Sequence, residues 1–122
     1  MCSLFGLIDF KECLSTHAKN KILNVLAREC QVRGTDATGI AYNFNNRLRI
    51  YKRPIPARKM KVHVPHGVNV VMGHTRMTTQ GNAQFNQNNH PFLGHIDGSS
   101  FALAHNGVLW NDKELRMEEV CR

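Results

Sequence analysis

Apolar and polar residues follow one another in the first third of the chain in a pattern that predicts one strand and one helix. Residues 3–9 form a short apolar run of strand length. Ser15 stands where a helix N-cap is expected, and Gly34 stands where that helix should end. Between them, every fourth residue along one stripe is apolar: Ala18, Ile22, Leu26 and Cys30.

The middle of the chain predicts an antiparallel hairpin. Residues 39–44 and 47–52 are two strand-like runs. Asn45 and Asn46 separate them, and asparagine tolerates the positive φ angles that a tight two-residue turn requires. We therefore expect the two runs to pair with each other.

Beyond the hairpin, prolines and apolar residues set the expected boundaries. Residues 53–67 are interrupted by prolines and predict a loop, whereas residues 68–74 form a continuous apolar strand. Residues 76–100 are rich in Asn, Gln, Thr, Gly and His, with few apolar residues. We expect a long functional loop there, anchored by a strand at residues 101–105. A short helix is expected at residues 112–121, and no linker or internal repeat is expected.

The composition of the 122-residue chain is that of one globular domain, with 42% hydrophobic and 20% charged residues. No apolar run approaches the roughly 18 residues needed to span a bilayer. The N-terminus has no basic start and reaches an acid at Asp9, unlike a secretory signal. We therefore expect a soluble cytoplasmic protein with no membrane partner.

Cysteine and histidine spacing argues against disulfides and metal sites. The four cysteines form no C-x-x-C pair, so reduced thiols are expected. The pairs His63/His66 and His90/His95 lie in segments broken by Pro and Gly. Neither pair has the helical spacing that presents two imidazoles together. We expect neither a metal ion nor another cofactor.

The formal charge of +7 is concentrated between Arg47 and Lys61. A basic surface of this kind can contact nucleic acid or a phosphorylated ligand. The segment lacks the stacking aromatics and the motifs of nucleic-acid-binding proteins, and Leu48 and Ile50 alternate with its charges in strand fashion. We therefore favour a solvated strand face followed by a loop over a nucleic-acid-binding site.

A cysteine at position 2 suits nucleophilic catalysis. A small second residue permits removal of Met1, which leaves a thiol and a free α-amino group on the same residue. An amine with a pKa of about 8 can take the proton of a thiol with a pKa of about 8.5, directly or through a water. N-terminal nucleophile hydrolases use this arrangement, although many proteins that begin Met-Cys are not enzymes.

Four further segments follow Cys2 in order: Leu4-Phe5-Gly6, Arg33 to Gly39, Gly73 to Thr79, and His105-Asn106-Gly107. This ordered set extends over the whole chain and resembles the class II glutamine amidotransferases. The resemblance implies an α+β fold, the four-layer α/β/β/α sandwich of two antiparallel sheets found in N-terminal nucleophile hydrolases. It also implies an enzyme that removes ammonia from glutamine and passes it to a synthase domain or subunit.

The resemblance gives roles to five residues. Cys2 is the nucleophile, and the Asn106 amide and the Gly107 backbone N–H hold the oxyanion. Arg76 binds the α-carboxylate of glutamine, because a guanidinium holds a carboxylate with two parallel hydrogen bonds. Thr79 assists through its hydroxyl. From the residues alone, Asn106-Gly107 is also compatible with a hairpin turn, and Arg76 with a surface salt bridge.

The chain departs from the family pattern at two points. Ser3 occupies a position next to the nucleophile that is glycine in most of the family. The resemblance also implies an aspartate that binds the α-amino group of glutamine, and we expect it beyond Arg122. We therefore expect residues 1–122 to be the N-terminal portion of a glutaminase domain. Arg33 and Asp36 are expected to brace the turn behind the nucleophile. A catalytically silent binding or structural module on the same scaffold is the alternative.

Overall fold

Two helices and two antiparallel sheets make up the computed structural model, which describes residues 2–120. The larger sheet has the strand order β1-β4-β2-β3, with β1 at Ser3–Ile8, β2 at Ala37–Phe44, β3 at Arg47–Arg53 and β4 at Val70–Arg76. The smaller sheet pairs β5 (Phe92–Ile96) with β6 (Ser99–Leu103). The helices are α1 (Thr16–Cys30) and α2 (Asp112–Val120), with short 3-10 turns η1 (Gln31–Arg33), η2 (Ala57–Lys59) and η3 (Asn86–Asn88).

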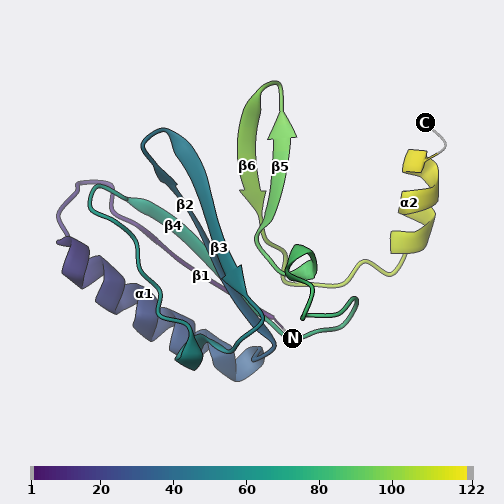
Figure 1. Ribbon diagram of the computed structural model, residues 1–122, viewed down its shortest axis with the longest axis horizontal. Coiled ribbons are helices and arrows are strands. Elements are labelled where there is room, and N and C mark those ends of the chain that lie inside the picture. The colour runs from purple at the N-terminus through teal and green to yellow at the C-terminus, as the bar shows by residue number, and fades with distance from the viewer. Residues whose placement is uncertain (1, 121–122) are drawn as a thin grey trace.

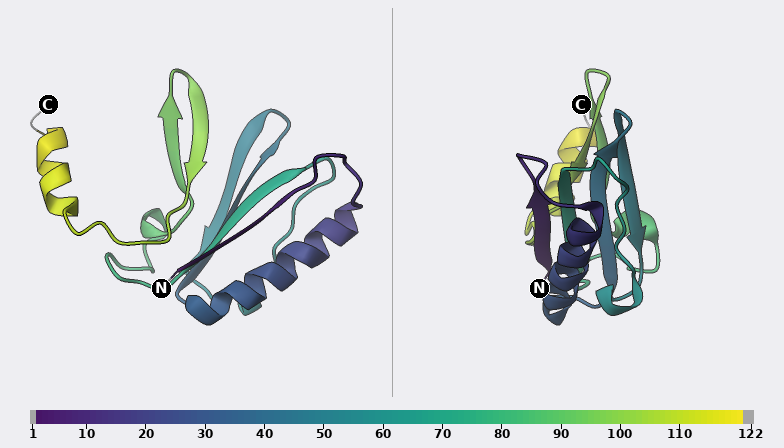
Figure 2. Two further views of the ribbon diagram at one scale, coloured as in Figure 1. Left: turned by 180° about the vertical axis from the view of Figure 1, so that it is seen from behind. Right: turned by 90° about the vertical axis from the view of Figure 1, so that its left-hand side faces the viewer.

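The elements are arranged in the order helix, sheet, sheet, helix. Helix α1 lies along one face of the four-stranded sheet, and the β5–β6 hairpin stands on the opposite side of that sheet (Figure 1). Helix α2 lies beyond the hairpin, at the other end of the molecule from α1 (Figure 2). This is the α+β architecture expected from the sequence, with part of the α/β/β/α sandwich in place.

Helix α1 begins where the sequence predicts. The Ser15 hydroxyl accepts a hydrogen bond from the Ala18 N–H at 3.1 Å, as an N-cap does. The buried residues of the helix are each one position after those of the predicted stripe. Ile22, a member of the predicted stripe, is exposed. The prediction followed hydrophobicity alone and so passed over a lysine that faces the core. The buried residues are Lys19, Leu23 and Ala27.

Lys19 can occupy the core face of α1 because its ammonium group has polar partners. Its Nζ atom donates to the carbonyl oxygen of Val68 at 3.0 Å and to Oδ1 of Asn69 at 2.6 Å. The same atom lies 3.7 Å from a carboxylate oxygen of Asp9. A buried charge without such partners would be strongly unfavourable. These contacts tie α1 to the loop after β1 and to the segment that enters β4.

The predicted hairpin of the larger sheet is confirmed. Strands β2 and β3 pair antiparallel, with Phe44 opposite Arg47. Asn45 and Asn46 have φ angles of 51° and 58°, which are the left-handed values of a two-residue hairpin turn. Strand β4 begins and ends slightly later than predicted, so that its last residue is Arg76.

The proline-containing segment between β3 and β4 forms no strand, as predicted, yet it supplies much of the core. The buried apolar side chains of this segment pack against Phe5 and Val71 of the sheet and Leu23 of α1. A buried segment outside regular structure must satisfy its backbone groups in another way. The buried apolar residues of the segment are Ala57, Met60, Val62, Val64 and Val68.

Two asparagines on α1 satisfy the backbone of this buried segment. The Asn24 side chain donates to the Val62 carbonyl oxygen at 2.7 Å and accepts from the Val62 N–H at 3.0 Å. Asn20 makes the same pair of hydrogen bonds with Val64, at 3.1 and 2.7 Å. The two side-chain amides therefore act as a substitute for a neighbouring strand.

The expectation of one long loop at residues 76–100 was wrong over its second half. Strands β5 and β6 form a hairpin whose turn residues, Asp97 and Gly98, have φ angles of 48° and 78°. Asp-Gly is a strong signal for a two-residue turn, and the scarcity of apolar residues concealed it. The strand expected at residues 101–105 begins at Ser99 and ends at Leu103.

Helix α2 corresponds to the short helix expected at residues 112–121, of which Cys121 lies outside the described residues. None of its residues from Asp112 to Val120 is buried. No helix within residues 2–120 is both long enough and apolar enough to cross a membrane.

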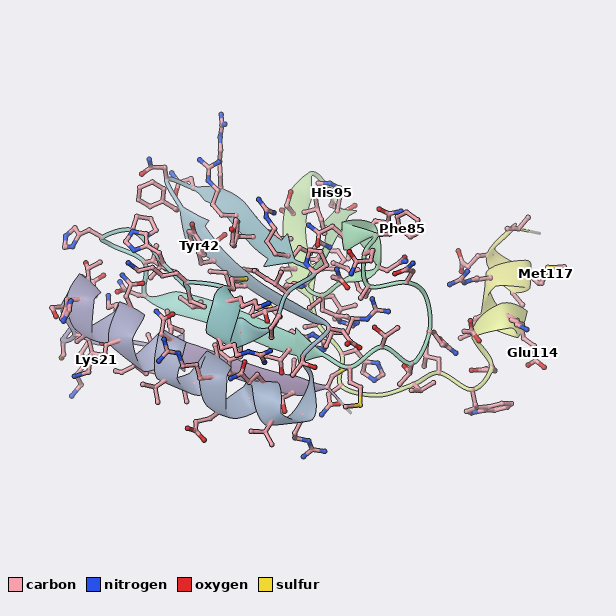
Figure 3. All side chains as sticks on the ribbon, turned by 60° about the horizontal axis from the view of Figure 1, so that its bottom comes forward. Lys21, Tyr42, Phe85, His95, Glu114 and Met117 are labelled. Atoms are coloured by element: carbon pink, nitrogen blue, oxygen red, sulfur yellow. The ribbon has the colours of Figure 1, made fainter. Side chains whose placement is uncertain are left out.

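Replacing Asn24 with alanine should lower the free energy of unfolding by about 1–3 kcal/mol, because the buried backbone groups of Val62 lose both partners. Urea unfolding measures this change. Lys21 is exposed on the same helix and points away from the sheet (Figure 3), so Lys21→Ala is the matched control. The control should shift stability by no more than about 0.5 kcal/mol. Equal effects of the two substitutions would contradict the role of Asn24.

Candidate functional site

A cavity of about 730 Å³ is formed where the start of β1 and the end of β4 meet the β5–β6 hairpin and α2. Asn106 is exposed and does not line this cavity. The structure therefore brings together all of the predicted site residues except that one. The predicted residues that line the cavity are Cys2, Arg76, Thr79 and Gly107.

Cys2 is placed by the pairing of β1 with β4. Ser3 stands opposite Thr75 in this pairing, so Cys2 lies beside the residues that follow β4. Cys2 is half-buried as a residue, and its Sγ atom lies 3.5 Å from the carbonyl oxygen of Met77. Ser3 is two residues before Phe5 on β1 and therefore lies on the same face of the sheet, and Phe5 packs in the core with Leu23 of α1. The serine that departs from the family pattern therefore points to the helix side of the sheet.

Arg76 is the last residue of β4 and is almost fully buried, with 6% of its surface exposed. Its Nη1 atom donates to Oδ1 of Asn89 at 2.8 Å, and its Nη2 atom donates to the carbonyl oxygen of Gln80. A guanidinium carries five N–H groups. Two contacts orient the group and leave further donors for a carboxylate that enters the cavity.

Asn89 was not among the residues singled out from the sequence, although it is fully buried beside Arg76. Its side-chain N–H donates to the carbonyl oxygen of Ala83 at 2.7 Å, which directs its Oδ1 atom to the guanidinium. Its own carbonyl oxygen accepts from Nζ of Lys52 at 2.6 Å. Within a run of Asn and Gln residues, the sequence holds no signal that distinguishes Asn89 from its neighbours.

Lys52 also corrects the interpretation of the basic segment. Lys52 is half-buried, and its ammonium group binds carbonyl oxygens of the chain that leads into β5, including that of Pro91 at 2.9 Å. Burial lowers the pKa of this ammonium group. Arg47, Arg49 and Arg53 are exposed on the same strand. The strand is therefore solvated on one face, as expected, while Lys52 on the other face supports the site.

The segment before β2 braces the end of β4. The backbone N–H of Asp36 donates to the carbonyl oxygen of Arg76 at 2.9 Å, and the Asp36 carboxylate accepts from the Thr78 N–H at 2.7 Å. A Cβ atom at Gly34 would lie 2.6 Å from the carbonyl carbon of Arg76. Gly34 is extended, with φ −170°, so close approach to β4 requires its lack of a side chain. Arg33 is exposed at the end of η1.

Asn106 and Gly107 follow β6 in an irregular segment. No strand follows them within residues 2–120, so they do not form the hairpin turn that the sequence left open. A Cβ atom at Gly107 would lie 2.7 Å from Cε1 of His105. The backbone of Gly107 therefore packs directly against the preceding imidazole. Thr79 is exposed at the cavity wall.

Three histidines form a cluster behind this segment. The rings of His74 and His90 stack with centroids 4.1 Å apart and an interplanar angle of 16°. His90 Nδ1 accepts a hydrogen bond from the His105 N–H at 3.1 Å, and His74 Nε2 lies 3.3 Å from the His105 carbonyl oxygen. A Cβ atom at Gly39 would overlap the carbonyl oxygen of His90. Sequence reasoning examined His90 only as a metal ligand and did not find the cluster.

Both stacked imidazoles are neutral near pH 7. Burial lowers the pKa of His74 to about 4, and the nearby charge of Arg76 adds to this effect. Burial likewise lowers the pKa of His90 to about 4, with added repulsion from His74, Arg76, His105 and Lys52. Residues 2–120 contain no group of three side chains that could hold a metal ion.

The comparisons with known proteins agree with this arrangement. Residues 1–120 match the family model for class II glutamine amidotransferases. The α+β fold with two antiparallel sheets is the one that the resemblance implied. The chain belongs to the class II glutamine amidotransferases.

The chain is similar to several proteins named glutamine–fructose-6-phosphate aminotransferase (isomerizing). The one from Sulfolobus acidocaldarius is 35% identical over 97% of this chain and 20% of its own length. The one from Symbiobacterium thermophilum is 34% identical over 97% of this chain and 18% of its own length. The chain therefore spans about a fifth of the length of these relatives. No solved structure gave a significant match.

The histidine cluster predicts that stability falls in mild acid. Both pKa values are about 4 in the fold against an ordinary 6.5, so the unfolded chain binds more protons between these limits. The contribution of the two histidines to the free energy of unfolding should be complete above pH 6.5 and should decrease as the pH falls towards 4. Urea midpoints at pH 7, 6 and 5 measure this trend. His90→Asn should flatten this trend. A level wild-type profile would count against neutral imidazoles at His74 and His90.

Proposed function

We propose that this protein hydrolyses the side-chain amide of glutamine through a thioester on Cys2 and releases ammonia. The observation that carries the proposal is the shared cavity of Cys2, Arg76 and Gly107, which come from three distant parts of the sequence. This cavity offers a nucleophile, a carboxylate-binding cation and a backbone N–H donor to one small molecule. Family membership supports the same reaction class.

The first chemical step uses both groups of an N-terminal cysteine. After removal of Met1, the α-amino group of Cys2 takes the thiol proton, and the thiolate forms a bond to the amide carbon of glutamine. The electron pair of the C=O bond moves to oxygen and gives a tetrahedral oxyanion. When the intermediate collapses, the C–N bond breaks and the Cys2 ammonium protonates the leaving group to ammonia. A water then cleaves the thioester and releases glutamate.

Two donors stabilise the oxyanion in this proposal. The Gly107 N–H belongs to a residue of the cavity wall, whereas the exposed Asn106 amide must turn towards the substrate. Catalytic hydrogen bonds often tighten only when substrate is bound. Loss of one such donor costs about 10²–10³ in kcat.

Arg76 and Thr79 bind glutamine itself. The guanidinium, oriented by Asn89 and Gln80, receives the α-carboxylate, and the Thr79 hydroxyl adds a hydrogen bond at the cavity wall. Arginine suits this task because its planar fork matches the two carboxylate oxygens. The reaction needs no metal ion or other cofactor.

The ammonia requires an acceptor, and we propose that a synthase domain or subunit supplies it. The relatives are about five times longer than this chain, and their name pairs glutamine with a sugar phosphate. Residues 1–122 would then act as the glutaminase portion of a cytoplasmic assembly. A catalytically silent module is the second candidate, and the exposed position of Asn106, away from the cavity, favours it.

Cys2 should be the thiol that a glutamine-like diazoketone labels fastest. Cys30 should react slowly, because burial raises the pKa of its thiol and so lowers the thiolate fraction. Cys13 is exposed but lies away from the cavity, and serves as the internal control for simple accessibility. Peptide mass spectrometry locates the label, and intact mass shows whether Met1 has been removed. Preferential labelling of Cys13, or a retained Met1 in an active protein, would sink the proposed mechanism.

Arg76→Lys and Asn106→Ala should separate binding from turnover. Lysine keeps the charge but not the two-pronged geometry, so Arg76→Lys should mainly raise KM for glutamine. Asn106→Ala should mainly lower kcat, by about 10²–10³. Glutamate release at a series of glutamine concentrations measures both constants. If Asn106→Ala changes only KM, Asn106 positions substrate and the oxyanion assignment is wrong.

A further inference from the structure

The backbone of His105 is held on both sides by imidazoles. Its N–H donates to Nδ1 of His90 at 3.1 Å, and its carbonyl oxygen lies 3.3 Å from Nε2 of His74. His74 is fully buried, and the two rings stack on each other. His105 immediately precedes Asn106 and Gly107, the two residues with the proposed oxyanion donors. A backbone position anchored at both of its polar groups has little freedom to shift.

We propose that His90, supported by the stacked His74, is a positioning residue that places the Gly107 N–H in the cavity by holding the backbone of His105. The inference rests on the proposed function and names the residue that organises its oxyanion-binding segment. The backbone of Gly107 packs against the His105 imidazole, as the 2.7 Å distance from a Cβ at Gly107 shows. A displacement of His105 is therefore passed directly to the donor.

The hydrogen bonds define one tautomer for each ring. Because His90 Nδ1 accepts, the His90 proton is on Nε2. Because His74 Nε2 faces a carbonyl oxygen, the His74 proton is also on Nε2, and its Nδ1 has no hydrogen-bond partner among the described residues. The His90 ring must be neutral for this arrangement, because only an unprotonated Nδ1 can accept the His105 N–H. Protonation of His90 would turn its Nδ1 into a donor facing another donor, and the bond to His105 would be lost.

Burial, and after it the positively charged groups nearby, lowers the pKa of His90 and keeps its ring neutral. Arg76 of β4, Lys52 of β3, His105 after β6 and the stacked His74 all disfavour a second proton on it. No acidic group contributes to its pKa. The anchor is therefore intact at neutral pH and opens only in acid.

Two substitutions at His90 distinguish the hydrogen bond from simple packing. His90→Phe keeps an aromatic ring for stacking but has no acceptor. His90→Asn loses the ring but places Oδ1 close to the position of Nδ1, since both atoms are two bonds from Cβ. His95 lies on the β5–β6 hairpin (Figure 3), outside the cavity lining, so His95→Phe is the matched control.

Glutamine hydrolysis should show a loss in kcat that His90→Asn restores. His90→Phe should lower kcat by about 10–100-fold, since misplacement of a catalytic group by about 1 Å can cost about 10². Its KM should change little, because Arg76 is held by other residues. His90→Asn should recover most of the loss and should retain activity further into acid than the wild type, because an amide oxygen does not titrate there. His95→Phe should match the wild type.

Each other outcome overturns a distinct statement. Wild-type turnover with an unchanged kcat in His90→Phe, or a change confined to KM, overturns this inference alone. Equal losses in the Phe and Asn variants show that an acceptor at this position does not restore turnover, which overturns the assignment of the positioning role to the hydrogen bond. A wild-type chain that neither turns over glutamine nor is labelled at Cys2 overturns the proposed function, and this inference with it.

Imidazole ¹⁵N chemical shifts test the anchor without any activity measurement. At neutral pH the His90 ring should show an unprotonated Nδ1 and a protonated Nε2, and the His105 amide signal should move in His90→Phe but not in His95→Phe. This experiment also covers the case in which His90→Phe fails to fold, because the wild-type spectrum gives the tautomer directly. A protonated Nδ1 on His90 in the wild type would exclude the proposed hydrogen bond.

Discussion

The pairing of β1 with β4 is the constraint on which the candidate site depends. With Ser3 opposite Thr75, Cys2 lies beside the end of β4. His74 and Arg76 alternate along β4 with Val71, which packs in the core with α1, so they project from the opposite face of the sheet. Side chains alternate between faces along a strand, so a slip of one residue would send both to the helix side. The same register buries Phe5 and Val71 under α1, and the apolar core thereby selects the register that the cavity requires.

Polar side chains carry much of the structural organisation of this small fold. Asn20 and Asn24 replace a missing strand for the buried segment before β4, and Lys19 closes the loop after β1. Asn89 and His90 do the same for the segment around the cavity. Each of these side chains stabilises the fold only while its hydrogen-bond partners are in place, because an unpaired buried polar group is costly. In both the site and the core, polar side chains hold irregular backbone segments in place through hydrogen bonds.

Sequence patterns predicted the elements whose signals are local. The Ser15 cap, the Asn45-Asn46 turn and the order of the motifs each depend on a few adjacent residues, and the cavity gathers four of the five predicted site residues. The roles of Asn89 and His90 could not be predicted, because they depend on contacts with residues far away in the sequence. The buried face of α1 was misplaced for the same reason, since the partners of Lys19 come from distant segments.

Gly39 influences the geometry of the site although it does not line the cavity. Its missing side chain lets the carbonyl oxygen of His90 rest against β2, which sets how closely the two sheets approach each other. Even alanine at this position would force the sheets apart and draw His90 away from His74. A substitution at position 39 would thus disturb the cavity from outside its lining. In this protein the spacing between the layers is itself part of the candidate site.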